Sequence, residues 1–321
     1  MQIEITEKIA PTATACPSCG QGGATKFLQA PDRYHGRHDL YQLLRCPSCS
    51  LVWLDNPPRP NEMGVHYGGD YDRSVSAAGE DLGRWQYKHE VVLRHKTGGA
   101  ILDLGCSSGG FLASLKGPSW RRHGIEMSAK VAEIAKAKCG ADVFVGDILD
   151  APYPPATFDV ITCFHVFEHL YQPREILAKV SEWLKQGGIF YTNMPNIHSA
   201  GSRTFGAYWY ALELPRHLYH FSPTSLRFLA GSAGLEEVWL ITGREPFIEA
   251  STRYYIDDLL LRKGIHRTPL AQVKQPGLAF RAVRKVFRLT LLPALNGMVS
   301  LAGDGESIHA VFRKKDARAH L

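Results

Sequence analysis

The sequence lacks the features of an exported or membrane-spanning protein. Its first residues, MQIEITEKIAP, contain no basic start followed by an apolar run, so no signal peptide is expected. No stretch of 18 uninterrupted apolar residues occurs, so no spanning helix is predicted. The seven cysteines are odd in number and four of them form two CxxC pairs, which favours a reducing compartment over a disulfide framework. We therefore expect a cytoplasmic protein.

Acidic residues are absent from one long segment near the C-terminus. Between residues 259 and 303 there is no Asp or Glu, whereas eight Lys and Arg residues occur, in a chain whose net charge is +6. Four of them recur at i, i+3, i+4 and i+7, as on one face of a helix: Arg281, Arg284, Lys285 and Arg288. Most such helices pack on their own domain, which is our first expectation. The alternative is a peripheral contact of residues 280–302 with the inner face of the membrane. No nucleic-acid-binding module is recognisable, so nucleic acid is not an expected partner.

Two near-identical cysteine motifs occur close to the N-terminus, CPSCG at residues 16–20 and CPSCS at residues 46–50. Each CxxC places two thiolates on one tight turn, and two such turns can close a tetrahedral site around Zn²⁺. A redox pair is the alternative, but the presence of two pairs and the lack of a helix pattern after either favour zinc. We predict a structural Zn²⁺ in a zinc-ribbon-like module of residues 1–55, with four ligands: Cys16, Cys19, Cys46 and Cys49.

A strand, a glycine turn and a helix follow one another in AILDLGCSSGGFLASL, residues 100–115. Ile101 to Leu104 has the apolar character of a short buried strand, and Gly105 and Gly109 allow the backbone to approach a ligand closely. A strand, a tight turn and a helix N-terminus form a general nucleotide-type cradle. GCSSGG is not the GxGxxG pattern, so an NAD site competes with other nucleotide-type ligands at this point.

Further strands follow, two of them with acidic residues at their ends. Glu126 ends a second strand about 20 residues after the glycine turn, where an acid can accept both hydroxyls of a ribose. Asp147 follows a third strand in residues 141–149. A fourth strand in residues 158–170 runs into a polar loop, and a fifth lies in residues 184–196 after a helix end and a Gly-Gly stop.

In this order the motifs closely resemble those of the class I S-adenosylmethionine (SAM)-dependent methyltransferases, over residues 99–242. The DxGxGxG motif is present with Ser107 in place of its middle glycine, which leaves slightly less room and adds a hydroxyl. The resemblance implies that Asp103 faces the amino-acid part of SAM, that Glu126 holds the ribose and that Asp147 binds the adenine amine. Helix capping is the alternative role for Asp103 or Asp147. The cofactor-binding residues implied by the resemblance are Asp103, Gly105, Cys106, Ser107, Gly109, Glu126, Asp147, Ile148, Phe164 and His165.

The N-terminal half resembles a narrower group. A CxxC…CxxC module followed by LVWLDNPPRPNEMGVHYGGDYD resembles methyltransferases of saccharide and cell-surface glycan biosynthesis. In that group Tyr67 and Tyr71 would lie on a cap over the cofactor, and we include them among its expected contacts. The alternative is aromatic packing on the catalytic domain. Residues 56–98 would form a linker and cap helices.

The end of the chain predicts an insertion in the sheet. SPTSLRFLAGSAG reads as a helix that begins at Pro223 with Ser222 as its N-cap, and residues 235–242 read as a sixth strand. The resembled fold ends with a seventh, antiparallel strand, for which residues 307–315 are the only good candidate. Residues 243–306 would then be an insertion within a methyltransferase domain of residues 99–321. The predicted fold class is α/β, a Rossmann-like seven-stranded methyltransferase sheet with a small N-terminal zinc ribbon and an insertion before the last strand.

Methyl transfer to a hydroxyl needs a base beside the acceptor, and histidine titrates near neutrality. Four histidines follow the fourth and fifth strands, at the edge where a doubly wound sheet binds its ligands: His165, His169, His217 and His220. LPRHLYHFSPTSL is similar to a HEHLSYFS-like stretch of sugar C-methyltransferases, whose histidine is implicated in deprotonating the substrate. This similarity implies that His217 is the base, with a structural histidine as the alternative. Arg216 stands where that pattern has an acid, which disfavours carbon methylation and indicates a contact with phosphate or carboxylate.

The motif FEHL, residues 167–170, supplies a further candidate. Glu168 and His169 could bind a metal, as in relatives resembling quinone-precursor O-methyltransferases, or cap the next helix, which we favour. The expected catalytic residues are therefore His217, His169 and Arg216. The expected reaction is O-methylation of a sugar, glycan or lipid-linked saccharide, with or without a phosphate on the acceptor. The alternatives are C-methylation of a nucleotide-linked keto-sugar, O-methylation of a quinone-type metabolite, and a non-enzymatic SAM-binding platform with a zinc-ribbon interaction module. The sequence implies no oligomeric state.

Overall fold

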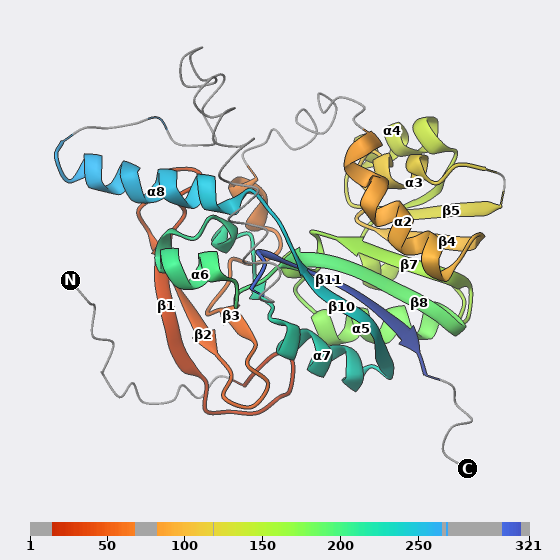
Figure 1. Ribbon diagram of the computed structural model, residues 1–321, viewed down its shortest axis with the longest axis horizontal. Helices are drawn as coiled ribbons and strands as arrows, with labels where there is room; N and C mark the ends of the chain where they lie inside the picture. The colour runs from red at the N-terminus through yellow and green to blue at the C-terminus, as the bar shows by residue number, and fades with distance from the viewer. Residues whose placement is uncertain (1–14, 68–81, 118, 265–267, 269–303, 316–321) are drawn as a thin grey trace. The chain divides into compact units, whose positions relative to one another are not determined.

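The computed structural model describes residues 15–67, 82–117, 119–264, 268 and 304–315 (Figure 1). The contacts of the chain group into two compact units. Unit 1 comprises the described residues within Met1–Pro58, Asn196–Leu226 and Gly243–Glu306. Unit 2 comprises those within Arg59–Pro195, Arg227–Thr242 and Ser307–Leu321.

The sheet of unit 2 has seven strands in the order β10-β11-β8-β7-β4-β5-β6 (Figure 1). Strands β4 to β8 run parallel, and β11 pairs antiparallel with β8. The strands are β4 (Gly99–Leu104), β5 (Trp120–Glu126), β6 (Asp142–Val145), β7 (Phe158–Phe164), β8 (Leu184–Pro195), β10 (Leu235–Gly243) and β11 (Ser307–Lys314). The predicted seven-stranded α/β sheet is thereby confirmed, including the last strand near the end of the chain.

Helices cover both faces of this sheet. Figure 1 shows α2, α3 and α4 on one side of the strands and α5 and α7 on the other. The helices are α2 (Gln86–His95), α3 (Gly110–Ser114), α4 (Ala129–Cys139), α5 (Pro173–Trp183) and α7 (Pro223–Ser232), with short 3-10 helices η1 (Met63–His66), η2 (Leu82–Trp85), η3 (Ile148–Asp150) and η4 (Phe167–His169). α7 begins as predicted, because the Ser222 hydroxyl accepts a hydrogen bond from the Ser225 amide at 3.2 Å.

The core of unit 2 lies between the central strands and the helices α2, α3 and α4. Ile101, Val160 and Val311 come from three strands and are fully buried, as are Phe111 of α3 and Ala132 of α4. Burial of each large apolar side chain contributes about 1.5–3 kcal/mol, so this layer holds the parallel strands in register. The carboxyl ends of β4, β5 and β7 therefore form a rigid edge.

Unit 1 is built around a second, smaller sheet. Its four strands follow the order β1-β2-β3-β9 and are antiparallel: β1 (Thr25–Pro31), β2 (Leu40–Arg45), β3 (Val52–Leu54) and β9 (Tyr219–His220). The helices of this unit are α6 (Ala200–Phe205), η5 (Gly206–Tyr208), η6 (Tyr210–Leu212) and α8 (Phe247–Leu261), and α8 packs against the other three. The carboxylate of Glu306 is buried and accepts hydrogen bonds from the Ser199 hydroxyl, the Gly201 amide and the Trp209 indole.

This grouping differs from the division drawn from the sequence, in which residues 1–55 were a separate module and 196–226 and 243–306 belonged to the methyltransferase domain. The cause is β9, which pairs with β3 through Val52 with His220 and Trp53 with Tyr219. The strands that adjoin the cysteine turns therefore share one sheet with β9, which begins two residues after His217. Within the described residues, no helix is both long and apolar enough to cross a bilayer. The basic pattern predicted for residues 280–302 lies outside the described residues.

Candidate functional site

The turn between β4 and α3 has a tight backbone conformation and close neighbours. Gly105, Ser107 and Gly109 all have positive φ, at 69°, 49° and 72°. A Cβ at Gly105 would lie 2.5 Å from a methyl of Val166, so this position requires glycine. Ser107 adopts the left-handed conformation of the glycine that it replaces in the motif, at a cost on the order of 1 kcal/mol.

Glu126, at the end of β5, fixes this turn from one side. Its side chain is buried, and one carboxylate oxygen accepts from the Ser107 amide at 3.0 Å. The other oxygen accepts from the Ser128 amide, also at 3.0 Å. Each carboxylate oxygen can accept a second hydrogen bond. The arrangement therefore fits a ligand with two adjacent hydroxyls, such as the ribose of SAM.

Asp103, at the end of β4, is a buried carboxyl beside the same turn. It accepts a hydrogen bond from the Thr162 hydroxyl at 2.7 Å. Burial, with a smaller contribution from the nearby Glu126, raises its pKa to about 7, against the opposing effects of the Thr162 hydrogen bond and of Lys88 of α2. A cation beside Asp103 would stabilise its charged form. Asp103 therefore fits the ammonium group of the amino-acid end of SAM.

Asp147 and Ile148 stand where β6 ends. Asp147 is exposed and caps η3, since one oxygen accepts from the Leu149 amide at 2.8 Å. The capping role considered for this residue is therefore present, and it leaves the second oxygen for other partners. Ile148 is buried. Cys106 is buried against Gly124, and burial raises the pKa of its thiol.

The loop after β7 holds Phe164 and His165. The Phe164 ring contacts those of Phe111 and Tyr191, each at a centroid distance of 4.9 Å. Lys88 lies over the Phe164 ring at 4.5 Å, and sequence reasoning missed this lysine. His165 is partly exposed at a φ of 53°, and its Nδ1 lies 3.4 Å from a carboxylate oxygen of the buried Glu168.

His169 and Tyr67 meet in unit 2. The Tyr67 hydroxyl lies 3.3 Å from Nδ1 of His169. α5 begins at Pro173 with Gln172 as its N-cap, so the capping role expected of Glu168 and His169 is wrong. Tyr71 lies outside the described residues.

His217 lies in unit 1, in a turn whose acid was missed by sequence reasoning. Its Nδ1 is 2.9 Å from the Ala211 carbonyl, and its Nε2 is 3.7 Å from a carboxylate oxygen of Glu213. The same carboxylate accepts from Arg216 at 2.7 Å, and all three side chains are largely buried. The Arg216 guanidinium also lies over the Tyr34 ring at 4.5 Å. The only sequence signal was the spacing of Glu213 from Arg216 and His217, three and four residues.

His220 has a different environment from His217. It is buried in β9, opposite Val52 of β3. This position within the small sheet agrees with a packing role. The two histidines of LPRHLYHFS therefore have different environments: His220 lies in β9, whereas His217 precedes that strand and lies beside the Glu213–Arg216 ion pair.

The four predicted zinc ligands converge in unit 1. The Sγ atoms of Cys16 and Cys49 are 3.6 Å apart, those of Cys19 and Cys46 are 3.5 Å apart, and all four lie within 4.8 Å of one another. A tetrahedral Zn²⁺ with Zn–S bonds of about 2.3 Å requires sulfurs about 3.8 Å apart, so the set fits zinc. The two turns are matched, because Gly20 and Ser50 each have a positive φ, at 73° and 62°. The Cys16–Cys49 hydrogen bond lowers the pKa of the Cys49 thiol and raises that of Cys16, so Cys49 is the thiolate of the pair.

Comparison with known proteins agrees with the fold and the cofactor edge. Residues 80–240, just over half of the chain, match a family described as a methyltransferase domain. A ubiquinone biosynthesis O-methyltransferase of Paraburkholderia xenovorans (strain LB400) is 29% identical over 153 residues, 44% of this chain and 66% of the relative. One of Thiobacillus denitrificans (strain ATCC 25259 / T1) is 28% identical over 151 residues, 43% of this chain and 65% of the relative. The chain thus spans less than two thirds of the length of these relatives.

Solved structures show the same architecture. A chain in the complex between the Haloferax volcanii Trm112 methyltransferase activator and a methyltransferase has a TM-score of 0.50 and 17% identity. The match covers 81% of this chain and 99% of that one. The structural match therefore agrees with the family match: the Rossmann-like sheet has the methyltransferase fold. The chain belongs to the methyltransferase domain family, in its class I SAM-dependent form.

Proposed function

We propose that the protein transfers a methyl group from SAM to a hydroxyl of a sugar, a glycan or a lipid-linked saccharide. SAM, when bound, supplies a methyl group on a positively charged sulfur. Glu126 would hold the ribose, Asp103 would face the amino-acid end, and Asp147 with Ile148 would receive the adenine. The buried carboxylate of Glu126, which accepts two hydrogen bonds from backbone amides, supports this assignment.

The observation that carries the proposed chemistry is the contact of His217 with Glu213. The Ala211 carbonyl can only accept a hydrogen bond, so Nδ1 of His217 carries the proton. In the neutral ring Nε2 is then unprotonated and can take a proton from an acceptor hydroxyl. Glu213, 3.7 Å from Nε2, would stabilise the imidazolium that forms. His217 is therefore the proposed base and Glu213 its positioning residue.

The acceptor that we propose is uncharged at its reacting end. From the sequence alone Arg216 indicated a phosphate or carboxylate. In the structure its guanidinium is already bound to Glu213 and stacked on Tyr34. Arg216 therefore no longer favours a phosphorylated acceptor, whereas a neutral acceptor with hydroxyl groups needs no such cation.

C-methylation of a keto-sugar is the second candidate, and Glu213 favours it. This reaction was disfavoured because the acid adjoining the histidine was replaced by Arg216. In the structure, Glu213, four residues before His217, supplies a carboxylate beside the histidine in place of the missing acid. The same pair could therefore abstract a proton from carbon.

A quinone-type acceptor is the third candidate, favoured by the printed names of the relatives, which are ubiquinone biosynthesis O-methyltransferases. It would be indicated by a requirement for a divalent metal that is lost in Glu168→Gln and His169→Asn. We also propose that Zn²⁺ binds the four cysteines as a structural ion.

The test is a turnover assay with SAM against nucleotide-sugars, lipid-linked sugars and a catechol, with NMR of each product. A methyl ether on a sugar supports the first proposal, and a methyl group on sugar carbon, with deuterium exchange at that carbon, supports the second. Turnover of the catechol alone supports the third. If SAM is bound but no class of acceptor is methylated, the proposal of an active methyltransferase is overturned.

A further inference from the structure

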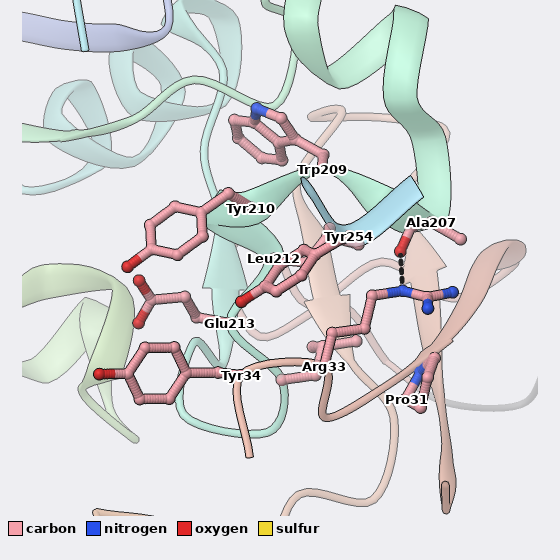
Figure 2. Close-up of a pocket in the computed structure, with 10 residues that line it drawn as sticks. Pro31, Arg33, Tyr34, Ala207, Trp209, Tyr210, Leu212, Glu213 and Tyr254 are labelled. Carbon is pink, nitrogen blue, oxygen red and sulfur yellow. Dashed lines mark hydrogen bonds between the residues drawn. The ribbon is translucent and has the colours of Figure 1, made fainter. Parts of the chain in front are cut away.

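The inner side of helix α8 is used by the fold of unit 1. Ser251 and Tyr254 of this helix are buried. The Ser251 hydroxyl accepts a hydrogen bond from the Tyr210 amide at 2.9 Å, and the Tyr254 ring is stacked on the Tyr210 ring at a centroid distance of 5.9 Å (Figure 2). These contacts hold α8 against η5 and η6 and determine which side of the helix faces outward.

The outer side of α8 carries an apolar stripe. Tyr255, Ile256 and Leu259 recur at the spacing of one helix face, and they are 48%, 42% and 43% exposed. The same face is polar at its start, with Glu249 and Thr252, and becomes apolar toward the C-terminal end of the helix. A helix that packs on its own domain normally presents charged and polar residues on its outer side. Three large apolar side chains in one exposed stripe therefore indicate a binding surface.

The two carboxylates in the C-terminal half of α8 are paired with arginines. A carboxylate oxygen of Asp257 lies 3.3 Å from Nε of Arg253, and one of Asp258 lies 3.0 Å from Nε of Arg262. These pairs offset the negative charge beside the stripe, so they present little repulsion to an anionic surface.

Positive charge follows the stripe along the chain. Arg262 and Lys263, directly after α8, are exposed. The sequence continues with six more Lys and Arg residues up to residue 303 and with no Asp or Glu, whereas the rest of the chain has a net negative charge. Such a run of one sign attracts an anionic partner.

An anionic bilayer is the partner that fits both observations. Tyr, Ile and Leu side chains enter the boundary between the headgroups and the acyl chains, and Lys and Arg are attracted by anionic headgroups. Nucleic acid would use the positive charge, but its phosphates offer little to three exposed apolar side chains. A second copy of the chain could cover the stripe, but it would bring two segments of like charge together.

We propose that the stripe of Tyr255, Ile256 and Leu259 docks on the surface of an anionic phospholipid bilayer. The C-terminal half of α8 would lie at the headgroup boundary with these three side chains inserted, and the positive charge that follows would strengthen the contact. The contact is with the bilayer surface and does not require a helix that crosses it. The inference does not depend on the proposed function, because docking needs neither SAM nor an acceptor. If the acceptor is lipid-linked, docking would also concentrate the enzyme at the surface that holds it.

The test is co-sedimentation of the full chain, without SAM, with vesicles of phosphatidylcholine alone or with about 30% phosphatidylglycerol. The parent should bind the anionic vesicles at least about tenfold more tightly, and added salt should weaken this binding. Combining Ile256→Ser with Leu259→Ser should weaken it about tenfold, because two apolar side chains no longer enter the bilayer. The matched control combines Ile241→Ser with Leu93→Ser in unit 2, where these residues are 38% and 39% exposed, and should bind as the parent does.

The outcomes separate the surface from its partner. Weakened binding of the α8 variant but not of the control variant supports the proposal. Equal binding of the two variants, whether at the affinity of the parent or below it, overturns the assignment to α8. Equal binding of the parent to both kinds of vesicle, or to neither, overturns the anionic bilayer as the partner. Sedimentation velocity without vesicles then shows whether a second copy covers the stripe, and thermal unfolding of each variant distinguishes a lost contact from a lost fold.

Discussion

The cofactor edge of unit 2, which is the carboxyl ends of β4 and β5 with Asp103 and Glu126, and the turn of unit 1 around His217 hold their carboxylates in different ways. Glu126 stands at the end of a strand and is fixed by backbone amides of adjacent turns. Glu213 lies in an irregular segment and is fixed by side chains, those of Arg216 and His217. Backbone anchoring depends on the order of secondary structure and can be recognised along the sequence. Side-chain anchoring depends on tertiary contacts, so its residues can vary while the fold is kept.

The two regions also differ in what stabilises them. Unit 2 has a large apolar layer, whereas the cysteines of unit 1 bring two turns together around a site that fits zinc. Substitutions in the two units should therefore have different effects.

Removal of a zinc ligand should have the largest effect. Cys46→Ser should reduce bound zinc from one ion per chain to near zero, because a structural site needs all four ligands. Structural zinc contributes roughly 10 kcal/mol to folding, so the small sheet should unfold. Metal analysis and circular dichroism measure both effects, and calorimetry should still detect SAM binding. Cys139→Ser, on α4, is the control. Full zinc content in Cys46→Ser would contradict the site.

Loss of the Glu126 carboxylate should have the second-largest effect. Glu126→Ala should weaken SAM binding about 1,000-fold, since two hydrogen bonds to a charged group are lost at about 1.5–3 kcal/mol each. Isothermal titration calorimetry measures this. Glu133→Ala, an exposed glutamate on α4, should leave affinity unchanged. Unchanged SAM affinity and turnover in Glu126→Ala would refute the cofactor assignment.

Much of the cofactor edge was predictable because its determinants are local. The turn from Asp103 to Gly109 was recognised by glycine spacing, and Glu126 by its distance from that turn. The last strand was predicted because the resembled fold ends with a seventh, antiparallel strand, for which residues 307–315 were the only good candidate, and β11 pairs antiparallel with β8. The boundary of unit 1 was not predictable, since the pairing of β9 with β3 joins residues far apart in sequence.

The acceptor side was predicted only in part, and for a physical reason. His217 was named as a candidate base from the sequence, but the roles given to Arg216 depended on its having no visible partner in the sequence pattern. Its partners, Glu213 and Tyr34, come from a preceding turn and from the loop after β1. Side-chain partners of this kind depend on tertiary packing, and the periodicity of the sequence does not indicate them.

Asp103 gives the cofactor edge a pH dependence. Its pKa is about 7 in the folded protein and 3.8 when exposed. Between these values the folded state holds a proton that the unfolded state releases, so stability falls as pH rises from 4 to 7 and is flat above. Asp103→Asn, which can still accept from Thr162, should therefore have a free energy of unfolding about 4 kcal/mol above that of the parent at pH 8 and nearly equal to it at pH 4. Urea unfolding without SAM measures this, and a pH-independent difference would contradict it.

On the acceptor side, His217→Asn should reduce turnover about 100-fold, because asparagine can still donate to Ala211 but cannot take a proton. SAM affinity should not change. The matched control is His38→Asn, an exposed histidine of unit 1. Normal turnover of His217→Asn across pH 6–9 would show that another group is the base.

Glu213→Gln should have the smallest effect and is the most direct test of side-chain anchoring. The amide can still accept from Arg216, but it no longer offers a charge to the imidazolium of His217, so kcat should fall about tenfold. If Glu213 acts only through His217, Glu213→Gln should add little to His217→Asn, since the two side chains then work as one unit. If the losses multiply, Glu213 contributes independently of His217, for example by binding the acceptor. A change in KM with kcat unaltered would assign it to acceptor binding alone. Glu237→Gln, at an exposed ion pair with Arg227, is the control and should leave both constants unchanged.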